Sequence, residues 1–246
     1  MPNNDRVSER YYGQINSEDS HEATRSRIHW ICAQASGSRV LDVGCSQGIA
    51  SILLAREGFS VTGIDLDAAS LRFARAELAR ESKPVRDQIA FQLASILDFE
   101  AGEHRFDTVI LGEILEHFAH PGRLIARASG LLARGGKLIV TVPYGYHPYH
   151  DHKQTFYAGS LSRLLYPKFR ECALEVRHKY LCYAGVKRGR PASPPAPGAD
   201  RLRRWMELDE AEFLRIEQEQ QRRMNQRKAA LDRAAARLKQ FEERGE

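Results

Sequence analysis

The sequence predicts an α/β fold: a doubly wound, mostly parallel sheet followed by a long C-terminal helix. Two observations carry this prediction. Between Arg39 and Tyr183, short runs rich in Val, Ile and Leu alternate with segments whose apolar residues recur at helical spacing. Such alternation is typical of strand–helix units that build a parallel sheet covered on both faces. From Leu202 to Arg244 the chain lacks Pro and Gly and is rich in Ala, Glu, Gln and Arg, which favours one long helix.

The predicted elements follow one another in a regular order. Continuous apolar runs indicate buried strands, and apolar residues three or four positions apart, such as Leu71, Ala74 and Leu78, indicate helices. Gly135 and Gly136 predict a turn before the last of these strands. The strands are expected at residues 39–43, 60–65, 89–93, 106–111 and 137–142, and the helices at 49–57, 68–81 and 121–132.

Composition divides the chain into four parts. In the helical extension, Met224, Leu231 and Leu238 recur every seven residues. This spacing favours a coiled coil, which would join copies of the chain or dock a partner, over a solvated single helix. The parts are an N-terminal arm with a lid helix at residues 1–38, the α/β domain at 39–186, a linker rich in Pro, Gly and Ala at 187–201, and the helical extension at 202–246.

Length, cysteine content and charge exclude several classes of protein. No apolar run approaches the ~20 residues needed to cross a bilayer, and residues 1–10 are polar where a signal peptide would be apolar. The 4 cysteines form no C-x-x-C pair, which argues against a disulfide framework or a zinc knuckle. We therefore expect a cytoplasmic protein without a membrane span. The net charge of +5 permits a polyanionic partner without requiring one.

A glycine-rich loop follows the first predicted strand. Asp42 ends that strand, Gly44 and Gly48 flank the loop, and the second strand ends in Asp65. Doubly wound sheets bind nucleotides where a helix N-terminus meets such a carboxylate, so this order predicts an adenosyl ligand. The loop is not the G-x-G-x-x-G of pyrophosphate sites. Asp42 would repel a pyrophosphate but suits a ligand that carries an amino group and a sulfonium.

These residues resemble those of the class I S-adenosylmethionine-dependent methyltransferases. The resemblance rests on residues 40–48 and 61–65 and extends over about residues 40–165. It implies a Rossmann-like domain that transfers a methyl group from S-adenosyl-L-methionine to an acceptor.

The resemblance also implies roles for single residues. Asp42, Gly44 and Gly48 would line the methionine part of the cofactor, and Asp65 would bind both ribose hydroxyls. Ser46 stands where the family usually has glycine, and its small side chain should still let the backbone approach the ligand. After the third strand, the implied adenine contacts are Ser95 and Ile96.

A second group of chemically active residues follows the fourth strand. If this segment is helical, Glu113, Glu116 and His117 share one face at positions i, i+3 and i+4. The loop at residues 143–157 emerges at the same sheet edge and carries three histidines, the last of which is His152. Two carboxylates with imidazoles suit Mg²⁺ or Mn²⁺. We expect either a metal held by these four residues or, without a metal, His117 or His152 as general base.

Two further resemblances suggest acceptors. Glu113, Glu116 and His117, together with His152, resemble the Glu-x-x-Glu-His segment and later histidine of bacterial small-RNA 3′-terminal 2′-O-methyltransferases, which bind a divalent metal. Leu115-Glu116-His117 also resembles a stretch of metal-free small-molecule methyltransferases. Residues 143–157, with the helical tail, are similar to methyltransferases attached to bacterial glycan-assembly proteins, where the acceptor is a sugar hydroxyl.

From these resemblances we expect an O-methyltransferase that acts on a hydroxyl of a glycan or another small polar acceptor. One alternative is a metal-dependent RNA 2′-O-methyltransferase. The other is a scaffold protein that binds the cofactor without turnover, while its helix recruits partners.

Overall fold

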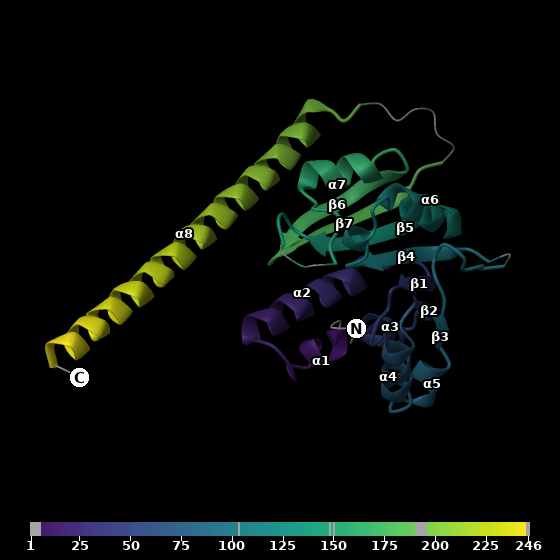
Figure 1. The fold of residues 1–246 in the computed structure, drawn as a ribbon. Helices are drawn as coiled ribbons and strands as arrows, with labels where there is room; N and C mark the ends of the chain where they lie inside the picture. Colours follow the sequence, from purple (N-terminus) through teal and green to yellow (C-terminus); the bar gives the residue numbers. More distant parts are fainter. Residues whose placement is uncertain (1–5, 103, 148, 150, 190–195, 245–246) are drawn as a thin grey trace. The chain divides into compact units, whose positions relative to one another are not determined.

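The computed structural model describes residues 6–102, 104–147, 149, 151–189 and 196–244. The chain divides into two compact units, Met1–Ala196 and Pro197–Glu246. The first unit contains the whole sheet and the second contains one helix (Figure 1). Residues 190–195 of the predicted linker lie outside the described residues.

The first unit is built on a seven-stranded sheet with the order β3-β2-β1-β4-β5-β7-β6. The first five strands in this order are parallel, which confirms the doubly wound fold. The order reverses at β1, so the chain leaves the centre of the sheet first towards β3 and later towards β5. The parallel strands are β1 (Arg39–Val43), β2 (Ser60–Asp65), β3 (Ile89–Leu93), β4 (Phe106–Gly112) and β5 (Leu132–Pro143).

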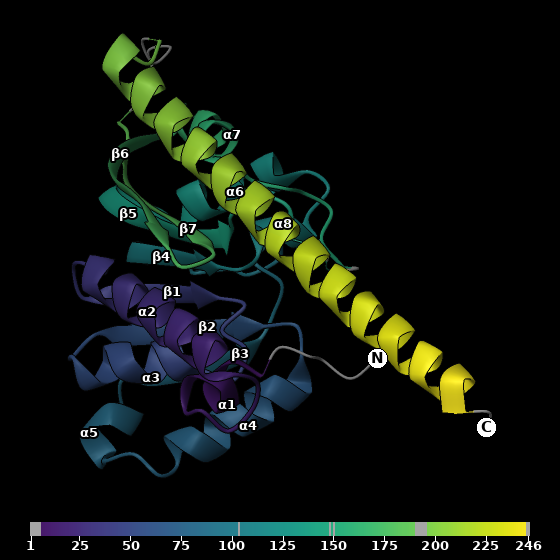
Figure 2. The ribbon, with the colours of Figure 1, turned by 90° about the vertical axis from the view of Figure 1, so that its left-hand side faces the viewer.

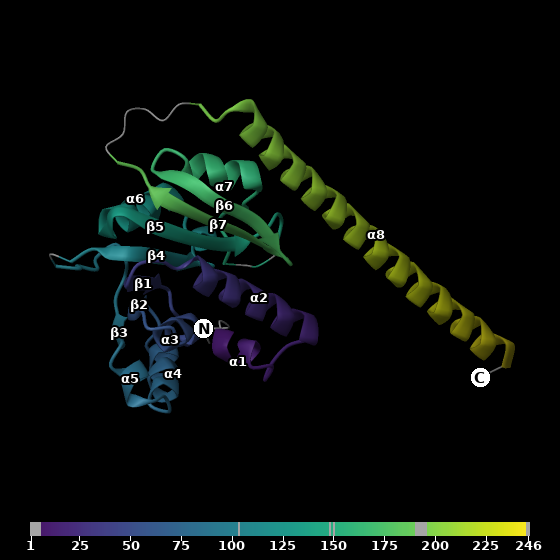
Figure 3. The same cartoon turned by 180° about the vertical axis from the view of Figure 1, so that it is seen from behind.

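Two features of the sheet differ from the predicted elements. An antiparallel hairpin of β6 (Phe169–Arg177) and β7 (Tyr180–Lys187) continues the sheet beyond β5, and the pattern of the sequence did not predict it (Figure 3). The predicted turn at residues 133–136 is wrong, because these residues belong to β5. Gly135 adopts a positive φ of 73° inside the strand, where the β4–β5 register shifts. The two glycines therefore form an irregularity within β5.

Helices cover both faces of the sheet. α2 and α3 pack on one face, and α6 and α7 pack on the other (Figures 1 and 2). The predicted helix at residues 68–81 is shorter than expected, because Pro84 lies in the first turn of a separate short helix. The helices of this unit are α1 (Val7–Tyr11), α2 (Glu18–Gln34), α3 (Ile49–Arg56), α4 (Ala68–Leu78), α5 (Lys83–Arg86), α6 (Pro121–Leu131) and α7 (Ala158–Leu165).

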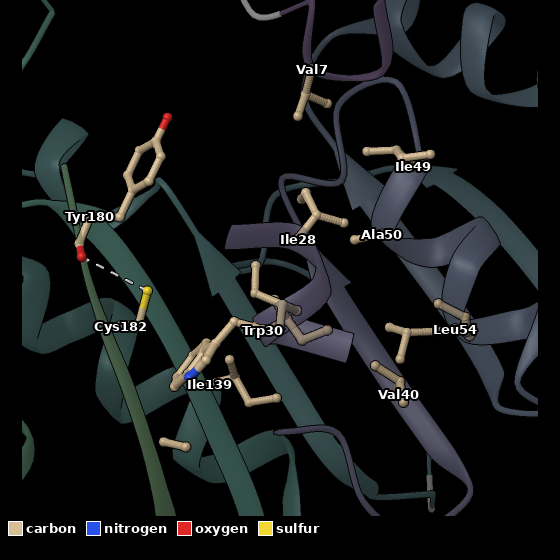
Figure 4. Packing of buried hydrophobic residues seen from close by; sticks show 14 of the residues in the cluster. Val7, Ile28, Trp30, Val40, Ile49, Ala50, Leu54, Ile139, Tyr180 and Cys182 are labelled. Carbon is tan, nitrogen blue, oxygen red and sulfur yellow. Dashed lines mark hydrogen bonds between the residues drawn. The ribbon is translucent and has the colours of Figure 1, made fainter. Parts of the chain in front are cut away.

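One large apolar cluster joins α2 and α3 to the central strands. Ile28 and Trp30 of α2 lie near Val40 of β1, Leu54 of α3 and Ile139 of β5 (Figure 4). All five side chains are buried. Burial of side chains of this size contributes about 1.5–3 kcal/mol each, so this cluster fixes the two helices on the sheet face beside the glycine-rich loop.

The second unit is α8 (Ala199–Arg244), a helix of 46 residues, which confirms the predicted long helix (Figures 2 and 3). Met224 and Leu231 of the seven-residue repeat are 61% and 70% exposed. Leu238 belongs to the part of the helix whose side chains are outside the described set. Within the described part of the chain, none of the helices combines the length and the apolar character needed to span a membrane.

A single carboxylate ties the start of β1 to β4. Oδ2 of Asp107, in β4, accepts hydrogen bonds from the backbone N–H groups of Ser38 (2.8 Å) and Arg39 (3.0 Å) and from the Ser38 hydroxyl (3.3 Å). These bonds, the backbone ones above all, lower the pKa of Asp107. The carboxylate therefore holds the two central strands in register at their first residues.

Asp107→Ala should lower the free energy of unfolding by about 1–2 kcal/mol, because three donors lose a charged acceptor. Urea denaturation measures the change. Asp87→Ala is the matched control: its ion pair with Lys83 is largely exposed, so its loss should cost under about 0.5 kcal/mol. Equal losses in the two variants would contradict the proposed tie between β1 and β4.

Candidate active site

The glycine-rich loop is held by hydrogen bonds to the end of β2. Gly44 and Cys45 donate their backbone N–H groups to the carbonyl of Ile64, at 2.7 and 3.1 Å. Ser46 donates its N–H to Oδ2 of Asp65 at 2.8 Å, and Oδ1 of Asp65 accepts the N–H of Asp67 at 2.8 Å. Asp65 therefore sits against the loop, as expected for a carboxylate at the nucleotide-binding edge of the sheet.

Three loop residues adopt the left-handed backbone conformation. φ is 63° at Gly44, 48° at Ser46 and 81° at Gly48. A Cβ at Gly44 would lie 2.1 Å from Cδ1 of Ile114, and one at Gly48 would lie 2.7 Å from the Phe91 ring. Glycine is thus required at both positions by conformation and by space. Ser46 is the exception, and its N–H bond to Asp65 holds it in a conformation that costs a non-glycine residue about 1–2 kcal/mol.

α1 covers this loop. The Ser8 N–H donates to Oε1 of Gln47 at 2.9 Å, and the Ser8 hydroxyl donates to the Gln47 carbonyl at 3.1 Å. Nε2 of Gln47 in turn donates to Glu9 at 2.8 Å. These contacts hold the N-terminal arm against the loop, where the sequence analysis placed a lid.

A cavity beneath the arm contains two buried groups of opposite charge. Asp42 is 4% exposed and accepts a hydrogen bond of 2.7 Å from the Ser51 hydroxyl. The pKa of Asp42 is raised to about 6, mainly by burial. The Ser51 hydrogen bond lowers this pKa, and the charge of Asp65 raises it. Arg27 is 5% exposed and lies 5.0 Å from the centre of the Tyr180 ring. The cavity lining comprises Val7, Arg27, Ile28, Ile31, Asp42, Gly44, Cys45, Ser46, Ile49, Ala50, Ile110, Gly112 and Glu113.

The cavity fits the amino-acid end of S-adenosylmethionine. Its carboxylate suits an ammonium group, and its guanidinium suits a carboxylate. The sequence analysis missed Arg27. The sequence feature that could have identified it is an arginine next to the apolar residues Ile28 and Ile31, on a helix that packs on the sheet. An arginine in such a position is buried only when it has a partner or a ligand.

The expected adenine contacts differ in their exposure. Ile96 is 3% exposed, which leaves almost no surface for an adenine ring. Leu66, Leu93 and Leu97 are exposed apolar side chains near these residues, at 73%, 60% and 40%. Ser95 is half-buried and its hydroxyl accepts the N–H of Leu97 at 3.2 Å, so its role towards adenine stays a prediction.

The predicted helical face after β4 is wrong. Glu113 adopts a φ of 59°, and only Leu115–His117 form one turn of 3₁₀ helix. Glu113 therefore lines the cofactor cavity and lies outside the group formed by Glu116, His117 and His152. In this group, each residue offers a ligand atom within 4.8 Å of the others. One carboxylate and two imidazoles could hold a divalent metal ion.

The loop after β5 is fastened to the same turn. Lys153 and Gln154 donate their backbone N–H groups to the carbonyl of Glu116 at 2.7 and 3.1 Å. This brings the His152 ring to 5.2 Å from the His117 ring, measured between centroids. Glu116 itself is 1% exposed. His150, the second histidine of the loop, lies outside the described residues.

His117 also has an acidic partner that the sequence analysis did not assign. Its Nδ1 lies 3.2 Å from Oδ2 of Asp151. When Nδ1 carries the proton and donates to this carboxylate, Nε2 is the basic nitrogen. A cleft beside the pair is lined by Tyr146, His147, Tyr149, His152, Lys153, Gln154 and Thr155. Burial, with the nearby Lys179 charge, lowers the pKa of His147.

The fold and the glycine-rich loop resemble those of the class I S-adenosylmethionine-dependent methyltransferases. Residues 41–140 match the model of the methyltransferase domain family. The chain is 36% identical over 119 residues to a ubiquinone biosynthesis O-methyltransferase of Thiobacillus denitrificans, covering 47% of this chain and 50% of that protein. It is 35% identical over 125 residues to the enzyme of the same name from Pseudomonas aeruginosa, covering 49% and 52%. The chain thus spans about half the length of the curated relatives it matches.

Solved structures show the same fold. The N-methyltransferase NodS from Bradyrhizobium japonicum has a TM-score of 0.58 at 19% identity, covering 70% of this chain and 99% of NodS. The glycopeptide N-methyltransferase MtfA, solved with S-adenosylmethionine, has a TM-score of 0.54 at 17% identity, covering 68% and 94%. These structures share the doubly wound fold that the sequence predicts.

Asp65→Asn should weaken binding of S-adenosylhomocysteine about 10–100-fold in isothermal titration calorimetry. A role of Asp65 towards the ribose hydroxyls predicts this loss, since hydrogen bonds to a charged group are worth about 1.5–3 kcal/mol. Asp67→Asn is the control. Asp67 caps α4 by accepting the N–H groups of Ala69 and Ser70, and asparagine is an equally good cap. A similar loss in both variants would argue against the assignment.

Proposed function

We propose that this protein is an S-adenosylmethionine-dependent O-methyltransferase that acts on a hydroxyl of a glycan or another small polar acceptor. The observation that carries the proposal is the His117–Asp151 pair. His117 follows β4 only four residues after Glu113, which lines the cavity, and Asp151 comes from the loop after β5. A buried cofactor site and a partly exposed imidazole base at one sheet edge are the two parts that methylation of a hydroxyl requires.

Oxygen is favoured as the acceptor atom by two arguments. The curated relatives, at 35–36% identity over about half of each chain, are O-methyltransferases. The N-methyltransferases among the solved structures are only 17–19% identical and support the fold alone. A neutral hydroxyl also attacks poorly and needs a base, whereas an unprotonated amine already carries a free lone pair. The His117–Asp151 pair supplies such a base.

Each residue has a defined task in this reaction. When bound, S-adenosylmethionine supplies a methyl group on a sulfonium, so that transfer forms a C–O bond, breaks a C–S bond and leaves S-adenosylhomocysteine. Nε2 of His117 accepts the hydroxyl proton as the acceptor oxygen attacks. Asp151 fixes the tautomer and stabilises the imidazolium that forms. Asp42 and Arg27 orient the amino-acid end of the cofactor.

The cleft beside the base suits a polar, cyclic acceptor. Tyr146 and Tyr149 are exposed, at 67% and 37%, and present aromatic faces on which the apolar face of a sugar ring packs. Lys153 and Gln154 of the same lining offer donors to hydroxyl or carboxylate oxygens. The residues that line this cleft include aromatic and polar side chains but no Leu, Ile, Val or Met, which favours a glycan over a lipid-like quinone.

A second candidate function rests on the group formed by Glu116, His117 and His152. These residues could hold Mg²⁺ or Mn²⁺, which would acidify the acceptor hydroxyl and fix its position, as in RNA 2′-O-methylation. Glu113, the second carboxylate of the expected set, lies outside the group, which leaves a single acidic ligand. His117 cannot act as both a metal ligand and a base through the same nitrogen, so the two functions can be separated by experiment.

His117→Ala should lower kcat about 10²–10⁴-fold, the usual contribution of a general base, with little change in affinity for S-adenosylhomocysteine. Transfer of radiolabel from S-adenosylmethionine into a bacterial glycan pool measures it. His104→Ala, an exposed histidine in the turn before β4, is the control. Asp151→Asn should lower kcat as well, since it removes the carboxylate beside Nδ1. Unchanged kcat in both site variants would exclude His117 as the base.

Chelation separates the two candidate functions. We expect label to enter glycan equally with a chelator and with added Mn²⁺, and Glu116→Gln to keep most of the activity. Label that enters small RNA only with Mn²⁺, and is lost in Glu116→Gln, would replace the proposal with the metal-dependent function. Binding of the cofactor without label in either pool would favour a scaffold protein.

A further inference from the structure

The charges of α8 are sorted along its length. Residues 205–219, here called the acidic segment, contain six acidic residues and one basic residue. Residues 220–240, the basic segment, contain seven basic residues and one acidic residue. At 1.5 Å per residue, each segment is about 20–30 Å long. The helix therefore carries two oppositely charged halves end to end, which the net charge of the chain conceals.

Ion pairs within the helix engage part of these charges. Arg215 pairs with Glu212 and Glu219, at 2.6 and 3.1 Å, and Arg223 also pairs with Glu219. Among the described residues, no ion pair engages Glu210, Glu217, Arg227 or Arg233. In the basic segment, Arg223 and Arg227 stand four residues apart, as do Arg233 and Arg237, and like charges at this spacing destabilise an isolated helix.

The helix also exposes large apolar side chains in both segments. Phe213 in the acidic segment is 54% exposed, and Met224 and Leu231 in the basic segment are 61% and 70% exposed. Apolar side chains three, four or seven residues apart on a polar helix are the usual contacts between paired helices. These apolar side chains are few, so the charged residues beside them determine which helix can pair with α8.

We propose that α8 pairs with α8 of a second copy of this chain in an antiparallel arrangement. Each acidic segment then lies against the basic segment of the other copy. Reversal about the centre of the helix brings Glu217 to within two residues of Arg227 and Lys228 of the second copy, and all three lie on the side of the helix that carries Met224 and Leu231. A parallel pair in register would instead place acidic beside acidic and basic beside basic along the whole contact. This inference does not depend on the proposed methyltransferase activity.

Charge reversal in the full-length chain tests the pairing. Sedimentation equilibrium should show a dimer whose Kd rises at least tenfold between 0.05 and 0.5 M NaCl, since exposed ion pairs are screened. Arg227→Glu with Lys228→Glu should weaken the dimer at least tenfold, and so should Glu210→Arg with Glu217→Arg. All four substitutions in one chain keep its net charge and should restore the dimer to within threefold. A monomer at every salt concentration, or a dimer indifferent to the paired substitutions, would overturn the proposal.

The direction of pairing is measured by the distance between two spin labels. A nitroxide is attached at Ala236→Cys, with the exposed Cys172 replaced by Ser. The antiparallel pair predicts about 45 Å between the labels of the two copies, from the rise of 1.5 Å per residue on each side of the centre. A parallel pair in register predicts under about 20 Å. Three results would each overturn the proposal: the short label-to-label distance of a parallel pair, the growth of filaments, or a chain that stays monomeric and binds RNA through the basic segment.

Discussion

The position of β1 between β2 and β4 is the constraint on which the candidate site depends. β1 pairs in parallel with both neighbours, so the three strands end at one edge of the sheet. The loop after β1 therefore meets Asp65 from β2 on one side and the residues after β4 on the other. The loop after β1 therefore lies next to both the proposed cofactor site and the proposed acceptor site.

Backbone strain concentrates where these strands end. Of the positive φ values at non-glycine residues, that of Ser46 lies in the loop after β1 and that of Glu113 lies directly after β4. The N–H of Glu113 donates to the carbonyl of Thr141 at 2.8 Å, which holds the residue in place. Because Ile114 then lies over the loop, only glycine fits at position 44. The two strained residues and the glycine are therefore parts of one packing arrangement between β1 and β4.

The sequence allowed the arrangement of the glycine-rich loop and its carboxylates to be predicted far better than that of the segments after β4 and β5. The loop, Asp42 and Asp65 are formed by consecutive elements, so their order and spacing carry the information. Arg27, Asp151 and the β6–β7 hairpin were missed because they depend on contacts between distant parts of the chain. Glu113 was placed wrongly for a related reason. The prediction from helical spacing ignores contacts with other parts of the chain. The hydrogen bond from Glu113 to Thr141 and the packing of Ile114 instead hold Glu113 in the left-handed conformation.

This difference follows from what each half must recognise. The cofactor is one molecule with fixed charges, so a buried carboxylate and a buried guanidinium in a packed cavity suit it. The proposed acceptor contacts instead come from a loop after β5 that is fastened to the His117 turn by two backbone bonds from residues 153 and 154 to Glu116. Backbone bonds of this kind keep the loop in place whatever side chains it carries. A change in acceptor would then need only new side chains in the loop, while His117 and Asp151 stay in contact.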